Sequence, residues 1–328
     1  MKLNPNTQFE HNGRTDMTPT FFRTLLLALT SILLLAGCDV GEDITYTEQY
    51  VVEGYLFATE PLSNIKLSRT VPFGTAYNFN DQAVNNAQVF VRLLDDNENV
   101  EREYAYQQVS PGVYRSPVQD PVLPARTYAL EIRIPDGKDT ILRSRTVVPD
   151  SFSITRATAD TIVYAGNQLE LTITTPSSPN NQNVYIFATE SLDPRFENLT
   201  PFFQDIFDQI DENQTPEDTL TFLNDLRISS SPLINEEFYD YNPDGTLQIR
   251  LPWISVIFFG PNTISANAVD DNVFNYISTQ TLQTDPSNLS PGEIPNVDDP
   301  IDGGVGLFGS YARVSKVIYV ARPPQALP

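Results

Sequence analysis

The sequence contains one histidine and one cysteine in 328 residues, and this scarcity excludes whole classes of chemistry. Ser-His-Asp and Cys-His catalysis need an imidazole to accept the proton of the nucleophile, and zinc sites use mostly His and Cys ligands. Both residues, His11 and Cys38, lie at the start of the chain, so the remainder has neither imidazole nor thiol. A Gly-rich phosphate loop is also absent from the sequence. What remains possible is carboxylate chemistry, such as a glycosidase-like acid pair or Ca²⁺ binding.

Positive charge is scarce as well. The chain has 20 Lys and Arg against 42 Asp and Glu, a formal net charge of -22. Nucleic-acid binding needs a basic surface that releases counterions from phosphates, so we exclude a nucleic-acid partner. Hydrophobic residues make up 40% and charged residues 19%, which is a composition that can bury a core rather than remain disordered.

A targeting segment is predicted at residues 17–37. Arg23 precedes a largely apolar run at 25–35, which is shorter than the roughly 20 residues that a transmembrane helix needs and is typical of a signal peptide. Leu35-Ala36-Gly37-Cys38 is similar to the bacterial lipobox, which implies cleavage before Cys38 and acylation of that residue. Several acyl chains together hold a protein stably on a membrane. The alternative is an ordinary buried thiol after a hydrophobic segment.

The segments on either side of the signal peptide have separate interpretations. Residues 1–16 are polar and fit no region of a signal peptide, so we interpret them as a non-native upstream extension before a start at Met17. Residues 38–48 form a lipidated tether that attaches the chain to the lipid bilayer through Cys38. Its acidic residues Asp39, Glu42 and Asp43 resemble the export tags of surface lipoproteins in the Bacteroidota, or they are simply a solvated tether.

The fold is predicted to be mostly β, beginning with a β-sandwich at residues 49–149. Apolar residues recur at period two, as on half-buried strands, at 50–57, 65–68, 87–94, 103–108, 112–115, 128–134 and 141–148. The stretches that contain Tyr114 and Tyr128 resemble a strand pair of immunoglobulin-like and transthyretin-like modules, which implies core or corner positions for these tyrosines.

A second β-sandwich-like domain is predicted at residues 150–328, after the boundary marked by Pro149. Strands are expected at 153–157, 168–174, 183–189, 247–251, 255–259 and 316–321. A helical insertion at about 193–241 has apolar residues at helical spacing, with Thr200 as N-cap and Pro201 at the first helical position. A further helix opens at Thr215, and another starts at about residue 270 and runs to 282.

Residues 240–245 begin like an EF-hand loop, with oxygen-bearing side chains at its first, third and fifth positions and Gly at the sixth. Position twelve is Leu251 instead of the bidentate Glu that the loop requires. Pro243 fixes φ and Gly245 accepts a positive φ, so a β-turn is favoured over a calcium loop.

Several motifs together resemble a Bacteroidota lipoprotein family known as domain of unknown function 4249. They are the lipobox, the opening at 50–56, the strands at 65–70 and 86–89, and the closing Ile301-Asp302-Gly303-Gly304-Val305-Gly306-Leu307-Phe308-Gly309-Ser310. The resemblance implies an outer-membrane lipoprotein encoded beside TonB-dependent receptors, on the periplasmic or the cell-surface face. The glycines of the closing motif could form a ligand loop, but a tight turn or bulge before a final strand is the favoured interpretation.

From these observations we expect a non-catalytic accessory or substrate-binding partner of a TonB-dependent uptake receptor, without cofactor or metal ion. The alternatives are a carboxylate-based glycan hydrolase and a purely architectural surface protein. The residue expected to be lipidated is Cys38. The candidate partner-binding residues are Phe202, Phe203, Trp253, Gly303, Gly304 and Phe308.

Overall fold

A computed structural model describes residues 46–177, 183–209, 215–239, 241–284 and 299–324. The chain divides into two compact units, residues 1–47 and 48–328, and every described helix and strand belongs to the second. The predictions for the upstream extension, the signal peptide and Cys38 lie outside the described residues. Within the second unit the structure is mostly β, as the sequence predicts.

The first seven strands agree closely with the predicted ones. In β1, β3 and β6, residues at period two face one core, and most of them are apolar. The elements are β1 (Tyr50–Phe57), β2 (Ile65–Arg69), α2 (Phe79–Gln82), β3 (Gln88–Leu94), β4 (Val100–Ser110), β5 (Val113–Arg115), β6 (Thr127–Ile134) and β7 (Thr140–Val147).

The rest of the chain alternates short strands with helices. The elements are β8 (Ile154–Ala157), β9 (Thr161–Val163), β10 (Glu170–Ile173), β11 (Val184–Ser191), η1 (Phe196–Asn198), α3 (Pro201–Asp208), α4 (Pro216–Asp225), β12 (Ile228–Ser230), β13 (Ile234–Asn235), η2 (Glu236–Phe238), β14 (Leu247–Arg250), η3 (Trp253–Ser255), β15 (Gly260–Val269), α5 (Asp271–Thr284) and β16 (Val305–Ala321). The predicted helices begin where expected, α3 with Pro201 in its first turn and α4 with a capping box between Thr215 and Asp218.

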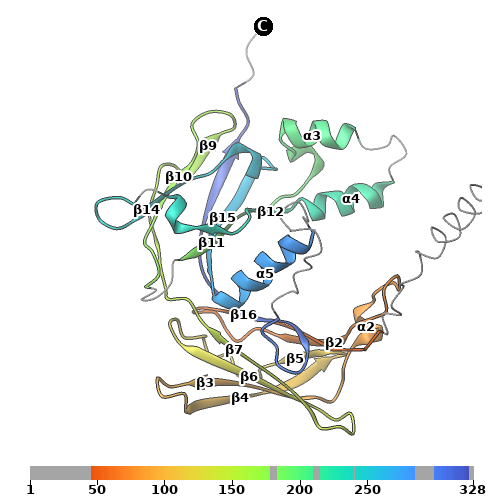
Figure 1. The fold of residues 1–328 in the computed structure, drawn as a ribbon. Coiled ribbons are helices and arrows are strands. Elements are labelled where there is room, and N and C mark those ends of the chain that lie inside the picture. The colour runs from red at the N-terminus through yellow and green to blue at the C-terminus, as the bar shows by residue number, and fades with distance from the viewer. Residues whose placement is uncertain (1–45, 178–182, 210–214, 240, 285–298, 325–328) are drawn as a thin grey trace, which may run out of the picture. The chain divides into compact units, whose positions relative to one another are not determined.

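Thirteen of the described strands form one large mixed sheet (Figure 1). Its main path runs β12-β11-β15-β16-β1-β2-β5-β4-β3-β6-β7, with β13 added beside β11 and β9 beside β16. The last strand, β16, is parallel to the first, β1, with Val51 opposite Val305 and Phe57 opposite Tyr311. The predicted domain boundary at residues 149 and 150 therefore does not coincide with a break in the sheet, because strands from both sides of it are hydrogen bonded to each other.

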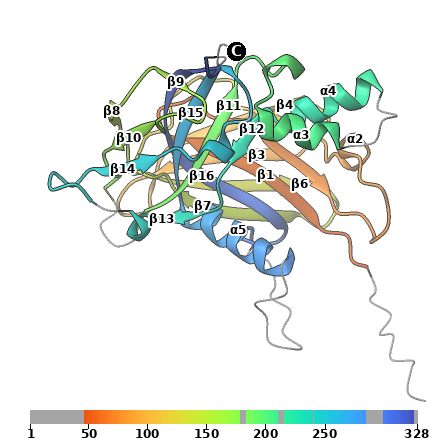
Figure 2. The ribbon, with the colours of Figure 1, turned by 90° about the horizontal axis from the view of Figure 1, so that it is seen from above.

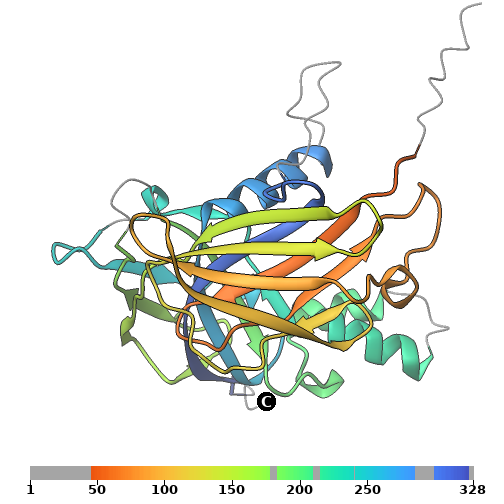
Figure 3. The same ribbon diagram turned by 90° about the horizontal axis from the view of Figure 1, so that it is seen from below.

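Strands β3, β4, β6 and β7, at the end of the sheet path, curl back over β1 and β16. Arg143 of β7 and Asp302 exchange two backbone hydrogen bonds of 3.0 and 2.8 Å, so the end of the sheet path meets the segment just before β16. Figure 3 shows the strands of residues 88–147 lying in front of β1 and β16. The space between these layers holds the main core, which includes Leu67, Tyr128 and Phe308, all with no exposed surface.

A smaller sheet, β14-β10-β8, packs on the same side as this core, farther along β15 and β16. We call this side of the large sheet the inner face. On the opposite side, the outer face, α5 covers only part of the sheet (Figures 1 and 2). Val273 of α5 packs on Val269 and Leu307 there. Farther along β11, β15 and β16, the described elements leave a depression on this face.

Two strand predictions were wrong. Residues 255–259 do not form a strand, since η3 and an extended segment with buried Phe258 occupy this region. The final strand starts at Val305, eleven residues earlier than the predicted 316, so the glycines at 306 and 309 lie inside β16 instead of in a turn before it. Glycine occurs in this strand interior because a Cβ would lie 2.1 Å from a neighbouring atom at Gly306 and 2.4 Å from one at Gly309. The turn prediction at 242–245 is confirmed by a 2.9 Å bond from Gly245 N to Asn242 O.

Candidate functional site

A groove of about 430 Å³ crosses the open part of the outer face. The strand register places its floor residues in line. Ser315 of β16 lies opposite Ser265 of β15, which lies opposite Ala188 of β11, which lies opposite Ser230 of β12. Facing residues of paired strands share one side of a sheet, so four small side chains form a continuous row. We call these four residues the serine row and the whole depression the sheet-face groove.

An aromatic wall closes one end of the groove. It consists of Tyr55 and Phe57 of β1 and Tyr311 of β16. The rings of Phe57 and Tyr311 are stacked, with centroids 5.3 Å apart and an interplanar angle of 15°. Tyr55 lies 5.9 Å from Tyr311, and both pack against the α5 cluster around Val273. Burial raises the pKa of the Tyr311 phenol, so its hydroxyl stays protonated at neutral pH.

Arg313 lies between the aromatic wall and the serine row. Its guanidinium carbon is 4.9 Å from the centroid of the Phe57 ring, a cation–π geometry. Its Nε donates a 2.6 Å hydrogen bond to Oδ1 of Asn267. Asn267 is 5% exposed, and its Nδ2 donates to the backbone oxygen of Ile186 at 2.9 Å. A buried amide that is itself held by β11 therefore fixes the orientation of an exposed guanidinium.

The far end of the groove is formed by the next row of paired residues. Thr263 of β15 lies opposite Glu190 of β11, and Glu190 lies opposite Ile228 of β12. Glu190 forms an ion pair with Arg227 at 3.3 Å. It is the only carboxylate among the described residues that line the groove. The groove thus has a cation at one end, a neutralised carboxylate at the other and hydroxyl groups between them.

The sequence interpretation did not identify the groove residues. The available signal was the aromatic alternation of Tyr55 and Phe57 within a predicted strand, followed much later by Tyr311 and Arg313, also two residues apart. Neither pair is informative alone. Only the register between β1 and β16 brings Phe57 beside Tyr311.

A buried carboxylic acid lies behind the aromatic wall. Asp270, the residue just before α5, accepts hydrogen bonds from the backbone N of Val273 and from the hydroxyl of Thr146 on β7. The Thr146 hydroxyl also contacts that of Ser310 on β16 at 2.6 Å. Burial raises the pKa of Asp270 to about 6, partly offset by these hydrogen bonds. Asp270 is 7% exposed and joins α5, β7 and β16, which is a structural role.

Of the predicted partner-binding residues, Trp253 lines a different depression. It lies on η3, where its ring is 5.2 Å from that of Tyr164, and it borders an open space of about 1010 Å³. The charged groups there neutralise each other, since Arg250 forms a 2.7 Å ion pair with Glu170. This depression therefore offers an aromatic ring without an uncommitted charge.

Phe202 and Phe203 lie on α3, with ring centroids 5.1 Å apart. Phe203 packs against a small core that contains Leu199 and Phe258, whereas Phe202 is 48% exposed. Phe203 and Trp253 pack against separate hydrophobic clusters, so the structure does not bring them together into one site.

The three remaining predicted residues pack inside the fold. Phe308 has no exposed surface and fills the main core, so its side chain does not reach a partner. A Cβ on Gly303 would lie 2.7 Å from the backbone oxygen of Ile141, and one on Gly304 would lie 2.8 Å from that of Tyr50. The glycines of the closing motif thus allow close contacts between backbones.

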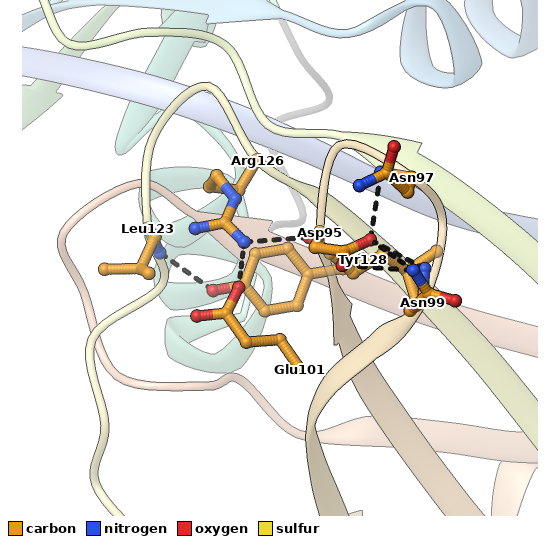
Figure 4. Close-up of polar contacts among 8 residues, drawn as sticks. Asp95, Asn97, Asn99, Glu101, Leu123, Arg126 and Tyr128 are labelled. Atoms are coloured by element: carbon orange, nitrogen blue, oxygen red, sulfur yellow. Dashed lines mark hydrogen bonds and ion pairs between the residues drawn. The ribbon is translucent and has the colours of Figure 1, made fainter.

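A second polar cluster, at the turn between β3 and β4, also has a structural role (Figure 4). Asp95 Oδ1 accepts hydrogen bonds from the backbone N of Asn97 and Asn99 at 2.9 and 2.8 Å, and these bonds lower the pKa of Asp95. Nearby, Tyr128 has no exposed surface, and its hydroxyl accepts a 2.9 Å bond from the backbone N of Leu123. The predicted core or corner position of Tyr128 is confirmed.

Two features are absent from the described residues. No group of three or more His, Cys, Asp or Glu side chains in them is arranged to hold a metal ion. None of their helices combines the length and the apolar composition that crossing a membrane requires.

Comparison with known proteins gives a family match and distant structural similarity. The sequence profile described as domain of unknown function (DUF4249) matches residues 38–317. No curated protein matches the chain significantly. The α-2-macroglobulins of Salmonella and Escherichia coli align with 84% and 88% of this chain at 12% identity, with TM-scores of 0.23 and 0.22. This chain covers only 15% and 16% of those chains. A tandem repeat from a large adhesion protein aligns with 82% of this chain and 48% of its own, at 12% identity and a TM-score of 0.20.

Proposed function

We propose that this chain, which belongs to the DUF4249 family, is an outer-membrane-anchored lipoprotein that binds a substrate or partner for a TonB-dependent uptake receptor and catalyses no reaction itself. The anchor rests on the lipobox that ends at Cys38. The binding function rests chiefly on the sheet-face groove, a preformed depression that presents an oriented guanidinium, hydroxyl groups and aromatic rings.

The same outer face supports a protein partner next to the groove. Val317 and Tyr319 are two residues apart on β16 and share its outer side, and they are 56% and 52% exposed. We call these two residues the apolar patch. Large apolar side chains that gather on one open sheet face favour an interaction surface, which we assign to the receptor.

We also propose that residues 49–149 are an immunoglobulin-like or transthyretin-like sandwich, completed by β16. The layered arrangement around the main core and the hydroxyl bond of Tyr128 to a neighbouring backbone N are consistent with such a module.

A glycan hydrolase is the less favoured alternative. Hydrolysis of a glycosidic bond by the usual route needs two carboxyl groups that face each other across the substrate. The groove contributes one, Glu190, and this carboxylate is paired with Arg227. Turnover on a polysaccharide panel that is lost in Glu190→Gln would favour the hydrolase instead.

The proposed function is tested by purifying the tagged lipoprotein from its native outer membrane in mild detergent, with crosslinking mass spectrometry of the recovered proteins. Stoichiometric recovery of one TonB-dependent receptor, with crosslinks to β16 near the apolar patch, is expected. Cys38→Ala is the matched control, since loss of the lipid should release the protein from the membrane fraction. Recovery of the lipoprotein alone would contradict the accessory function and favour the architectural alternative.

A further inference from the structure

Arg313 is an uncommitted cation in a strongly acidic protein. Acidic residues outnumber basic ones by 42 to 20, yet within the described part of the chain no carboxylate lies at ion-pair distance from its guanidinium. The neighbouring Arg227, by contrast, is paired with Glu190. An exposed arginine whose charge no protein carboxylate neutralises is available for an anionic ligand.

The guanidinium is also preorganised for a planar anion. The Phe57 ring on one side and the Nε bond to Asn267 fix its plane, and both terminal Nη groups remain without a partner among the described residues. Two parallel N–H groups match the two oxygens of a carboxylate. Arg313 is the only cation that lines the groove within the described chain, so a singly charged carboxylate fits better than a doubly charged phosphate.

The other residues of the groove indicate the chemistry of the rest of the ligand. The rings of Phe57 and Tyr311 stack on each other, so they present edges rather than open faces. Ser315, Ser265 and Ser230 offer hydroxyls that can both donate and accept, in a row that crosses four strands and spans about 14 Å at about 4.8 Å per strand. A ligand rich in hydroxyl groups matches this floor better than an apolar one.

We propose that the sheet-face groove binds an acidic sugar, with the carboxylate of a uronic acid on the Nη groups of Arg313 and the sugar hydroxyls along the serine row. This inference rests on the binding function proposed above but is independent of the receptor. It assigns Arg313 as the residue that selects the acidic over the neutral sugar, and Asn267 as the residue that positions Arg313.

The test is calorimetric titration of the full lipidated chain in non-ionic detergent with digalacturonate and with its neutral methyl ester. We expect the acid to bind at least 10-fold more tightly than the ester. Arg313→Gln should abolish this preference, while Ser315→Leu, which fills the floor without changing charge, should weaken both ligands. Circular dichroism melting verifies that each variant is folded.

Arg69→Gln is the matched control. Arg69 also lies over an aromatic ring, 5.5 Å from the centroid of Tyr50, but it is already paired with Glu48 at 3.2 Å. This variant removes the same charge and should leave binding unchanged.

Equal binding of acid and ester, no binding of either, or an unaltered preference in Arg313→Gln would overturn the inference. Acetate that binds as tightly as digalacturonate would overturn the sugar specificity. The sugar site and the association with the receptor are separate proposals. If the Arg313→Gln protein no longer binds the sugar but still recovers the receptor, the association with the receptor does not depend on the sugar site.

Discussion

The two halves of β16 have opposite environments although they belong to one strand. Residues 306–310 are all buried, because the main core covers their inner face and α5 covers their outer face. From Tyr311 to Ala321 buried and exposed residues largely alternate. The change occurs at Tyr311, where pairing with β1 ends opposite Phe57 and pairing with β15 begins opposite Val269.

This difference explains the sequence of each half. The first half leaves no room for a side chain at two positions: a Cβ on Gly309 would lie 2.4 Å from Val273 of the covering helix α5, and one on Gly306 would meet the backbone of the paired strand β1. A strand with one open face can carry polar and charged residues there, and the second half carries Arg313 and Ser315. One half of β16 is thus part of the core, and the other presents side chains on an exposed face.

The largest expected effect is that of Gly306→Val in the covered half. Gly306 has a φ of +111°, and a Cβ would lie 2.1 Å from the backbone oxygen of Val52. Since neither the conformation nor the space accepts a side chain, we expect a loss of more than about 4 kcal/mol or failure to fold. Urea unfolding followed by circular dichroism measures this loss.

Ser315→Val in the open half is the matched control for that substitution. Its side chain is exposed on the outer face and valine favours strands, so stability should change by less than about 0.5 kcal/mol. Equal losses for the two variants would show that the halves do not differ as described.

Truncation of aromatic side chains should give the next largest difference. Phe308→Ala leaves a cavity in the main core, and we expect a loss of about 3–5 kcal/mol. Tyr319→Ala removes a side chain that is 52% exposed and should cost much less. Thermal melting of both variants compares them, and similar shifts in the midpoint would argue that Phe308 does not anchor the core.

Elements with a clear apolar period were predicted from the sequence, and elements without one were missed. Strand β1 and helix α3 have clear apolar periods and were predicted at their observed positions. Strand β15 was missed because its inward positions include only Ile264, Ala266 and Ala268 as apolar residues, between polar ones. The first half of β16 was missed because glycines are also typical of turns.

The groove was beyond prediction for a different reason. Its floor takes one residue each from β12, β11, β15 and β16, which lie up to 127 positions apart in the sequence, as Ala188 and Ser315 do. Strand register across such separations is set by the packing of the whole sheet, and one sequence does not reveal it.

The buried acid between the halves should make stability depend on pH. Burial gives Asp270 a pKa of about 6, above its ordinary value of 3.8, so the folded state binds more protons between these values. The stabilisation that comes from protonated Asp270 is full below about pH 4 and is lost as the pH rises through 6. At about 1.4 kcal/mol per pKa unit, the shift corresponds to a loss of about 3 kcal/mol in the free energy of unfolding.

Asp270→Asn removes this titration and can keep the hydrogen bond from Val273 N. We therefore expect the stability of the variant, relative to the original protein, to increase by up to about 3 kcal/mol between pH 4 and pH 7. Carboxylates whose pKa is lowered, such as Asp136, act equally in both proteins and cancel in the difference. Parallel pH profiles from urea unfolding would contradict a buried, titrating Asp270.

The smallest expected effect on stability belongs to Val317→Lys in the apolar patch. Val317 is 56% exposed in the open half, so the change should alter stability by less than about 0.5 kcal/mol. If the patch contacts the receptor, a charge within it should still reduce recovery of the receptor severalfold, because burying an unpaired ammonium group is costly. Lys316→Gln, on the neighbouring residue that pairs with Asp160 at 2.7 Å, serves as the control that changes charge away from the patch. Full recovery of the receptor with Val317→Lys would place the contact elsewhere, and Phe202 on α3 would be the next residue to test by the same substitution.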